Sequence, residues 1–581
     1  MKVGAFSRSL SYFPRIRRRW MKGMLCVLPS SGLEIAVPLI VREVYGGIRR
    51  GDMSLGMVAA WSSLALLLVL IKGAAKFGMR WYITGASREF EQHFRQDLFA
   101  HLMTLSPRDV SHVRTGDIMS RSTADVEAVR LMLGPGVMYV SQAIVIVPGA
   151  LIAMALIDPV LMLAMLVPFV GLATVIRLAA PPTQRWSQAT QERLAEISTV
   201  AQENISGIRV VKAFAREAVS SGDFRKMGTS LFEANLRLAT LRGLTAAAIT
   251  AVKEFGVLVI LVLGGLHIVD GNMQPEDMFF FLMVLNIALW PLIAIGWMLG
   301  MYHRGKAGAE RLEELFALQP SVQEAAEPRT PETTRGALEV RDLTHAFDGA
   351  PVLQNVSFKV PAGATLGITG RTGCGKTTLV QLLARLIEPP PGTVFIDGVD
   401  VRDLPLDWLR KTIGVVPQDT FLFSETIHDN IAFAGEHVDR EQVLAAARLA
   451  HIHDDIEGFP TGYEQELGER GVTLSGGQRQ RTAIARTLAA RPPVMVLDDC
   501  LSAVDSVTEQ NILRQLRGAL AERTAVIVSH RVSALSLADH VIVLDEGRVE
   551  EAGSHEDLLA RGGLYAELHE RQQIEAELDE L

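Results

Sequence analysis

The chain has 581 residues, of which 49% are hydrophobic and only 6% aromatic, and its formal net charge is −8. This length exceeds what one hydrophobic core organises, and the apolar excess indicates that part of the chain lies in a membrane. The acidic balance, with no basic stripe, argues against nucleic acid as a partner.

Six apolar segments crowd into the first half of the chain, and each has roughly the 20 residues that a membrane-spanning helix needs. Short links join them in pairs, whereas about 60 charged residues with helical patterning separate the second from the third and the fourth from the fifth. We therefore expect an all-α transmembrane domain of six long helices over residues 1–317, with two long cytosolic loops. The predicted spans are about 20–41, 54–77, 137–157, 159–177, 244–269 and 278–301.

Basic residues set the predicted orientation of these segments. The link at 270–277 has no Lys or Arg, while the two long loops are rich in both, so the loops are predicted to be cytoplasmic. Basic residues before the first segment, with no cleavage site after them, put the N-terminus on the same side. The first short link departs from this rule because it carries Arg42, Arg49 and Arg50.

Several side chains of the apolar segments could serve a transported substrate. Five ionisable groups would face a cavity or a partner, or extend to the inner interface: Glu34, Lys72, Lys76, Lys253 and Glu254. Apolar residues of the last segment are equally consistent with a cavity and with helix packing: Phe279, Phe280, Met283, Trp290 and Trp297. The identity of the cargo stays open.

A change in composition separates the second half of the chain from the first. Residues 318–336 combine Pro, Glu, Thr and Ala without apolar periodicity, which predicts an exposed linker. Residues 337–572 have the charged, Gly-punctuated pattern of a soluble domain, and an acidic tail occupies 573–581. A solvated helix end is the favoured interpretation of the tail, and a contact with a partner is the alternative.

A predicted strand at Ala364–Ile368 leads directly into the sequence GRTGCGKTT. It matches the phosphate-binding loop G-x-x-x-x-G-K-[ST] between a strand and a helix, in which backbone N–H groups surround phosphates. Lys376 would contact the β- and γ-phosphates, and Thr377 would ligate Mg²⁺. The predicted ATP-binding residues of this loop are Gly370, Thr372, Gly373, Cys374, Gly375, Lys376, Thr377 and Thr378.

Two further motifs accompany the loop. The apolar strand residues of VMVLDD end at Asp498, the expected position of an acid that organises Mg²⁺. Upstream of it, LSGGQ offers a hydroxyl and open backbone amides at a predicted helix start, which is a second phosphate-recognising surface. This signature comprises Leu474, Ser475, Gly476, Gly477 and Gln478.

The three cysteines have neither metal-ligand nor disulfide spacing, which fits a reduced compartment. Cys374 lies within the phosphate loop, where a thiol reagent would crowd the phosphates. Cys500 is expected to be buried beside the strand that ends at Asp498.

With these motifs the chain resembles the ATP-binding cassette exporters over nearly its whole length. The resemblance implies an exporter-type membrane domain, then an α/β P-loop ATPase domain that uses ATP and Mg²⁺. It implies a multi-pass protein of the bacterial plasma (inner) membrane, with the ATPase domain and both termini cytoplasmic. Segments 106–121, 203–217 and 462–471 resemble the regions through which membrane and ATPase domains meet.

The same resemblance gives expected roles to five residues outside the two loops. Phe347 would stack on adenine, Gln418 would sense Mg²⁺ and the attacking water, and His530 would contact the γ-phosphate. Ser502 and Asp505 match the loop that crosses the dimer. The implied Mg²⁺ ligands are therefore Thr377, Gln418 and Asp498.

One position departs from the family pattern. The general base after the Mg²⁺-organising Asp is normally Glu, whereas this chain carries Asp499. The shorter side chain withdraws the carboxylate by about 1.5 Å, and a misplacement of about 1 Å costs roughly a hundredfold in rate. We expect ATP to bind here and to be hydrolysed slowly.

This departure favours a heterodimer. The family sandwiches each ATP between the phosphate loop of one chain and the signature of the other, and the LSGGQ of this chain is intact. A second half-transporter that carries the catalytic Glu would then form the one competent site. The alternatives are a homodimer with a slow Asp base and an ATP-gated channel or regulator.

Fusion of the membrane and ATPase domains on one chain favours export over import. The expected activity is ATP-driven alternating access that moves an amphipathic drug, lipid or peptide out through the bilayer.

Overall fold

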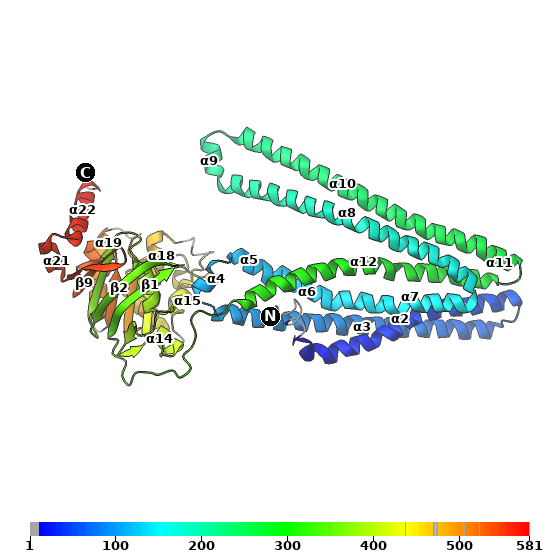
Figure 1. Ribbon diagram of the computed structural model, residues 1–581, viewed down its shortest axis with the longest axis horizontal. Helices are drawn as coiled ribbons and strands as arrows, with labels where there is room; N and C mark the ends of the chain where they lie inside the picture. The colour runs from blue at the N-terminus through cyan, green and yellow to red at the C-terminus, as the bar shows by residue number, and fades with distance from the viewer. Residues whose placement is uncertain are drawn as a thin grey trace. The chain divides into compact units, whose positions relative to one another are not determined.

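The computed structural model describes residues 8, 11–347, 349–435, 437–468, 471, 474–502, 506–521 and 523–579, and Figure 1 shows its elements. The chain divides into two compact units. The first contains the chain up to Leu102 and Val113–Leu318, and the second contains Met103–His112 and Gln319–Leu581. This division lies close to the expected end of the membrane domain at residue 317.

The first unit is all-α, as expected, and six of its helices within the described residues are long and apolar enough to cross a membrane. The third and fifth are continued through π-helical turns, so that they cover Thr115–Ile157 and Glu217–Val269. Apart from Ser54, the expected spans lie within these helices. The main helices are α2 (Phe13–Arg50), α3 (Leu55–Thr104), α7 (Val137–Ile157), α8 (Pro159–Ser206), α10 (Glu217–Val259) and α12 (Pro275–Ala317).

Shorter helical segments connect these helices. They are α5 (Thr115–Ser120), η1 (Arg121–Asp125), α6 (Val126–Leu131), η2 (Met132–Gly136), α9 (Ile208–Ala213), η3 (Ile260–Gly264) and α11 (Gly265–Val269). At about 1.5 Å per residue, the 48 residues of α8 extend more than twice the hydrocarbon thickness of a bilayer. The long helices therefore continue well beyond any membrane, as the patterning of the two long links predicts.

The three arginines that depart from the charge rule have acidic partners at the start of α12. Arg42 donates to Asp277 at 2.5 Å, and Arg49 and Arg50 lie 3.1 and 3.2 Å from Glu276. The side chains of Glu276 and Asp277 are only 4% and 7% exposed. These arginines therefore neutralise buried carboxylates, so the link that carries them is not a basic surface.

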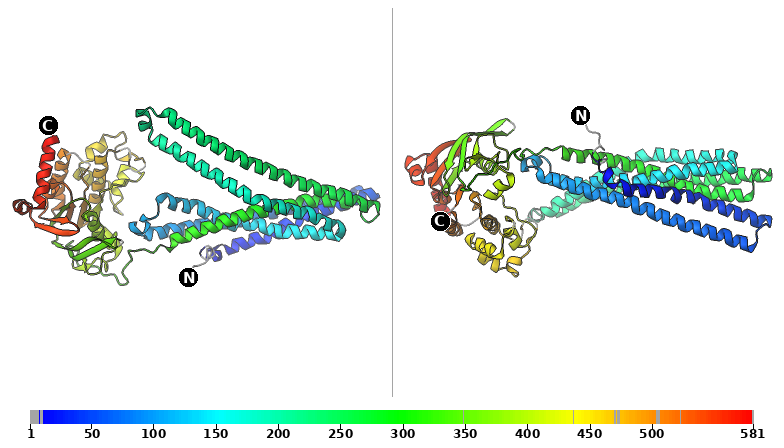
Figure 2. Two further views of the ribbon diagram at one scale, coloured as in Figure 1. Left: turned by 45° about the horizontal axis from the view of Figure 1, so that its top comes forward. Right: turned by 90° about the horizontal axis from the view of Figure 1, so that it is seen from below.

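The hairpin of α8 and α10 diverges from the other helices of its unit towards α9 (Figure 1 and the left view of Figure 2). Among the described residues of α8, burial ends at Leu172. Large apolar side chains beyond that point are exposed, including Phe214 and Phe232 at 73% and 65%. This part of the hairpin has an apolar surface that no other described element of the unit covers.

The apolar residues of α12 divide between packing and cavity. Phe280 is fully buried in the core of the membrane unit together with Met154, Leu161 and Met165. Trp290 instead lines a cavity between helices, which is described further below. Both interpretations of the α12 residues therefore hold, for different members of the set.

The second unit contains two β-sheets. A four-stranded antiparallel sheet has the order β2-β1-β4-β5, and a six-stranded sheet has the order β10-β9-β3-β8-β7-β6. In the larger sheet all neighbours are parallel except β10 and β9. The strands are β1 (Leu338–Phe347), β2 (Ala350–Val360), β3 (Thr365–Gly370), β4 (Val394–Ile396), β5 (Val399–Asp400), β6 (Ile413–Val416), β7 (Val494–Asp498), β8 (Thr524–Val528), β9 (His540–Asp545) and β10 (Arg548–Gly553).

The central strands β3, β7 and β8 are buried at every residue, because helices or the other sheet cover both faces of a mostly parallel sheet. The helices of the unit are α4 (Pro107–Ser111), α13 (Lys376–Leu383), α14 (Leu406–Thr412), α15 (Ile427–Ala432), α16 (Arg440–Leu449), α17 (His453–Glu457), η4 (Gly462–Glu464), α18 (Gly476–Ala489), α19 (Ser506–Leu520), α20 (Val532–Leu535), α21 (His555–Arg561) and α22 (Leu564–Asp579). Parallel strands bring their carboxyl ends to one edge, which is where ligands bind in such sheets. The expected α/β ATPase fold is confirmed.

The linker at 318–336 has no helix or strand, but it is tied to the second unit. Arg385 donates to the Gln323 carbonyl at 2.7 Å, and Glu324 accepts from the Leu406 amide at 3.1 Å. Val322 is buried. Most residues of this segment are nonetheless exposed, as expected, and composition does not reveal the hydrogen bonds that hold its first part, because they depend on distant residues.

Candidate nucleotide-binding site

The phosphate loop lies between β3 and α13 and depends on glycine. Gly375 has φ 101°, and a Cβ there would lie 2.9 Å from the Val352 carbonyl oxygen and 2.7 Å from Leu353. Any other residue would combine a left-handed backbone with a collision. The loop therefore keeps a shape in which α13 begins at Lys376, with its positive end at the cavity described next.

A cavity of about 220 Å³ opens where the strands of the larger sheet end. Lys376 and Thr377 follow β3, Asp498 ends β7, and Gln418 and His530 each lie two residues beyond β6 and β8. The structure thus brings together residues that are up to 178 positions apart in sequence (352 to 530). The remaining lining residues are Val352, Thr372, Gly373, Gly375, Thr378, Asp499 and Val528.

The Lys376 side chain is almost fully buried and turns back onto its own loop. Its Nζ donates to the carbonyl oxygens of Gly370 and Arg371 at 2.9 and 3.0 Å and lies 3.7 Å from the Cys374 sulfur. Gly370 and Cys374 therefore support the lysine rather than line the cavity. An arriving phosphate would take over the ammonium from these neutral acceptors, because an anionic oxygen makes the stronger hydrogen bond.

Two adjacent carboxyl groups, Asp498 and Asp499, lie at the end of β7. Burial raises the pKa of Asp498, and the negative charge of Asp499 adds to this, while Thr377 and Lys376 oppose it. The hydrogen bond between the Thr377 and Asp498 side chains sets two oxygen donors next to each other. Mg²⁺ prefers such oxygen ligands and usually completes its shell with water and substrate phosphates, so this pair fits the ion.

Asp499 has a backbone φ of 45°, a left-handed conformation that Asp tolerates better than most residues. Its amide donates to the Val528 carbonyl at 2.8 Å, which fixes the residue against β8. Gln418 Nε2 lies 3.5 Å from Asp499 Oδ2, at the outer limit of a hydrogen bond. The Asp499 carboxylate therefore makes at most a weak hydrogen bond with Gln418.

His530 faces the same cavity from the end of β8. Burial and the positive charge of Lys376 lower its pKa, and Asp499 partly opposes them. The neutral imidazole is thus favoured near pH 7, where it can donate one hydrogen bond to a phosphate. Gln572 of α22 holds this segment in place, because it contacts the His530 carbonyl and accepts from the Val532 amide at 2.9 Å. No sequence motif marks Gln572 for this role.

The signature forms a separate feature at the start of α18. Ser475 Oγ accepts from the Gln478 amide at 3.2 Å, and Gln478 Oε1 accepts from the Ser475 amide at 3.0 Å. Gln478 also donates to Asp455 at 2.9 Å, and Leu474 is buried. None of the residues 474–478 is among those that line the cavity of the phosphate loop. Gly476 and Gly477 begin the helix.

Phe347, the predicted adenine-stacking residue, ends β1 and does not line the cavity. The guanidinium of Arg108, on α4, lies 4.9 Å from the centre of its ring, and His345 packs edge-on at 5.0 Å. Ser321 donates to Asp109 at 3.0 Å and so ties α4 to this unit. The resemblance implies that segment 106–121 docks onto the ATPase domain, but no sequence signal singles out Arg108 as the contact with Phe347.

The remaining predicted residues have partial outcomes. Ser502 donates to the Asp499 carbonyl at 3.0 Å and accepts from Gln480 at 3.1 Å, so it braces the cavity. Asp505 lies outside the described residues. Cys500 is buried, as expected, and burial raises the pKa of its thiol to about 12.

Comparisons with known proteins cover almost the whole chain. Residues 20–292 match the model of the ABC transporter transmembrane region, and residues 353–502 match that of the ABC transporter. The multidrug resistance-like ATP-binding protein MdlA of Escherichia coli is 33% identical over 578 residues, covering 99% of this chain and 98% of that protein.

Two further proteins are similar along nearly their full length. The ATP-dependent lipid A-core flippase of Syntrophus aciditrophicus is 30% identical, covering 98% of this chain and 95% of its own. A solved bacterial Atm1-family ABC exporter with ATP bound has a TM-score of 0.78 at 27% identity, covering 96% of this chain and 98% of that one.

Proposed function

The chain belongs to the ABC transporter family, as an exporter with fused membrane and ATPase domains, and from that premise we propose that it is one half of a heterodimer. Its own ATP site is hydrolytically impaired, and a partner half-transporter supplies the catalytic Glu. ATP-driven alternating access then carries an amphipathic drug, lipid or peptide outward across the bacterial inner membrane. The ATPase domain and both termini are cytoplasmic in this proposal.

One observation carries the proposed asymmetry. The carboxylate that follows the Mg²⁺-organising Asp498 is that of Asp499, and its Oδ2 lies 3.5 Å from Gln418 Nε2. Both residues line the cavity, and a general base must come within about 2.6–3.2 Å, between heavy atoms, of the group whose proton it removes. Because Asp lacks one methylene of Glu, this carboxylate would not reach a water molecule beside the γ-phosphate. ATP would therefore stay bound at this site and be hydrolysed slowly.

The signature supports a role at the site of another chain. Ser475, Gly476 and Gln478 keep the residues of the family motif, and they do not line the cavity of their own phosphate loop. The exposed apolar surface of the α8–α10 hairpin also favours a second subunit. An intact signature beside an impaired base contributes to hydrolysis only if the partner carries the catalytic Glu at its own ATP site.

The names of the relatives support an amphipathic cargo. One is a multidrug resistance-like protein and another is a lipid A-core flippase, and their sequences align with almost all of this chain. Drugs and lipids share an apolar body and a polar end, which a cavity inside a membrane domain can accommodate.

A homodimer is the second candidate, and one observation favours it. Gln418 and His530 are both present and line the cavity with Asp499, so a slow hydrolysis at two equal sites is chemically available. In that case Asp499 acts as the general base.

ATP turnover distinguishes these candidates. The chain would be purified in nanodiscs, alone and with a second half-transporter of the same genome that carries Glu after its own Mg²⁺-organising Asp. We expect activity only with the partner, and loss of activity when the partner's Glu is replaced by Gln. Substitution Asp499→Asn should change little, whereas full activity of the chain alone, abolished by Asp499→Asn, would establish the homodimer. Low turnover together with passive ion conductance would instead identify a channel.

A further inference from the structure

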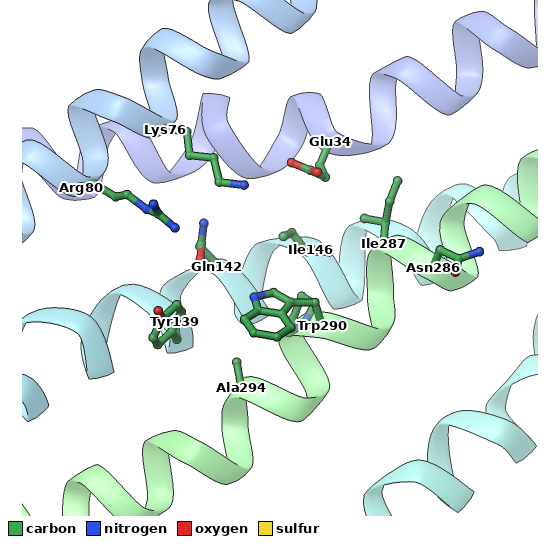
Figure 3. A pocket seen from close by; sticks show the side chains of 11 residues that line it. Glu34, Lys76, Arg80, Tyr139, Gln142, Ile146, Asn286, Ile287, Trp290 and Ala294 are labelled. Carbon is green, nitrogen blue, oxygen red and sulfur yellow. The ribbon is translucent and has the colours of Figure 1, made fainter. Parts of the chain in front are cut away.

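A second cavity, of about 390 Å³, lies inside the membrane unit between α2, α3, α7 and α12. Figure 3 shows Lys76 and Arg80 of α3 extending into the same space as Gln142 of α7, with Glu34 on α2 and Trp290 on α12. No motif of the sequence marks this site. Its residues come from four helices that tertiary packing alone brings together.

The charges around this cavity do not balance. Glu34, its one acidic lining residue, lies 3.5 Å from Lys72 and is thereby paired. Lys76 and Arg80 form no ion pair with any residue that the structure describes. Two cationic groups therefore remain for a ligand.

The described helices around the cavity place no second acid in its lining, and the acids nearest in sequence on α2 and α3, Glu43 and Glu89, are paired with Arg42 and Arg19. Residues 137–157 of α7 contain no Asp or Glu. The acids at the start of α12, Glu276 and Asp277, are paired with arginines of α2, and they lie at least nine residues before Asn286, the first cavity residue of that helix. The excess positive charge is thus local and uncompensated.

The rest of the lining is suited to an apolar chain. Ile146, Ile287 and Trp290 line the cavity beside the two cations, and the Trp290 side chain is 52% exposed. Lys76 and Arg80 lie where the apolar stretch of α3 ends, since the predicted span closes at residue 77. A ligand could therefore leave its apolar part among the aromatic and aliphatic groups while its charged end meets α3.

We propose that this cavity binds the anionic head group of an amphiphile, a phosphate or carboxylate that carries an apolar tail. Lys76 and Arg80 contact the head group, and Trp290 contacts the tail. Arg80 suits this role because its guanidinium donates two parallel hydrogen bonds to a phosphate or carboxylate. This proposal names the substrate class of the exporter. The claim that the amphiphile is transported rests on the proposed function, whereas the claim that it binds does not.

Binding is tested without ATP, in neutral phosphatidylcholine nanodiscs containing the assembled transporter. Dodecyl phosphate and dodecyltrimethylammonium have the same tail and opposite charge, and tryptophan fluorescence reports their binding. We expect dodecyl phosphate to bind at least tenfold more tightly. Trp290→Phe should remove most of the fluorescence change and so assign it to this cavity. Equal binding of the two amphiphiles, or a preference for the cation, would overturn the proposal.

Two variants test the named cations. Lys76→Gln and Arg80→Gln should each weaken dodecyl phosphate binding by at least about tenfold, because each variant loses a hydrogen bond to a charged group. Arg80→Lys should recover only part of the loss. Lys306→Gln is the matched control, since Lys306 is an exposed lysine of α12 that does not line the cavity. If the Gln variants at residues 76 and 80 bind as the control does, the assignment is wrong.

Competition distinguishes the sources of the anion. If a membrane lipid is the natural ligand, phosphatidylglycerol in the nanodisc should displace dodecyl phosphate. If the natural ligand is a soluble amphiphile, phosphatidylglycerol should leave dodecyl phosphate binding unchanged. Both outcomes support the proposal. Displacement by inorganic phosphate at equal concentration would refute the need for a tail. Because no ATP is present, these results do not depend on whether the Asp499 site is impaired.

Discussion

The two phosphate-recognising regions of the ATPase unit are built in different ways. The cavity at the phosphate loop takes residues from the ends of four strands, and its chemistry depends on how Gln418, Asp498, Asp499 and His530 meet. The signature is the start of one helix, held by hydrogen bonds between Ser475 and Gln478. One substitution can therefore impair the first region and leave the second intact. The heterodimer proposal requires this combination of an impaired phosphate-loop site and an intact signature.

The largest expected effect is at the signature. Ser475→Arg in the assembled heterodimer should lower ATP turnover by roughly a hundredfold, because it replaces a phosphate donor at the partner's competent site. ATP turnover of the purified complex is the measurement. Ser554→Arg is the matched control, since Ser554 caps α21 in the same way but lies in no phosphate-binding motif. If the Ser475→Arg complex hydrolyses ATP at the same rate as the control, the signature does not act at the partner's competent site.

Substitution of the loop lysine should affect the other region. Lys376→Ala should weaken ATP retention at this chain's own site by roughly tenfold to a hundredfold, since a buried charge-assisted contact is lost. Turnover at the partner's site should fall much less than with Ser475→Arg. Trapped nucleotide per complex and turnover are measured together. Equal losses of turnover from both variants would show that the two sites are equivalent.

A smaller effect is expected where α4 meets Phe347. Arg108→Ala should weaken ATP binding by roughly twofold to fivefold, because a cation over a partly exposed ring contributes about 0.5–1 kcal/mol. In our interpretation the guanidinium fixes the ring while adenine takes its other face. Arg108→Lys should keep part of the affinity. Tighter ATP binding by the Ala variant would instead mean that Arg108 competes with adenine. Equilibrium binding of a fluorescent ATP analogue to each variant distinguishes these two outcomes.

The smallest effect concerns pH. The pKa of His530 is lowered from its ordinary 6.5 in the folded protein. Its contribution to the free energy of unfolding is present above pH 6.5 and is lost as the pH falls through the lowered pKa. The change should be small, because the ring is partly exposed and solvent screens its interactions. Denaturant unfolding at stepwise lower pH should show a flatter dependence for His530→Gln.

Much of the architecture follows from local pattern. Runs of about 20 apolar residues predict the membrane helices, and GRTGCGKTT after an apolar strand predicts the loop, because glycines and Lys376 have a defined order there. The ends of the helices were not predicted, since beyond the bilayer α3 and α8 continue on charged residues whose pattern sets no clear boundary.

The sequence predicts which residues would carry ATP chemistry in this protein, because those residues lie in short motifs whose backbone shape is local. It also determined the Asp499 departure, which needs only one position to be read. Packing of the folded chain determines that Gln572 supports His530, that Arg108 lies over Phe347, and that Lys76 and Arg80 share a cavity with Trp290 and with Glu34, an acid already paired with Lys72. These depend on side chains that are distant in sequence and meet only after packing, so no spacing rule can reveal them.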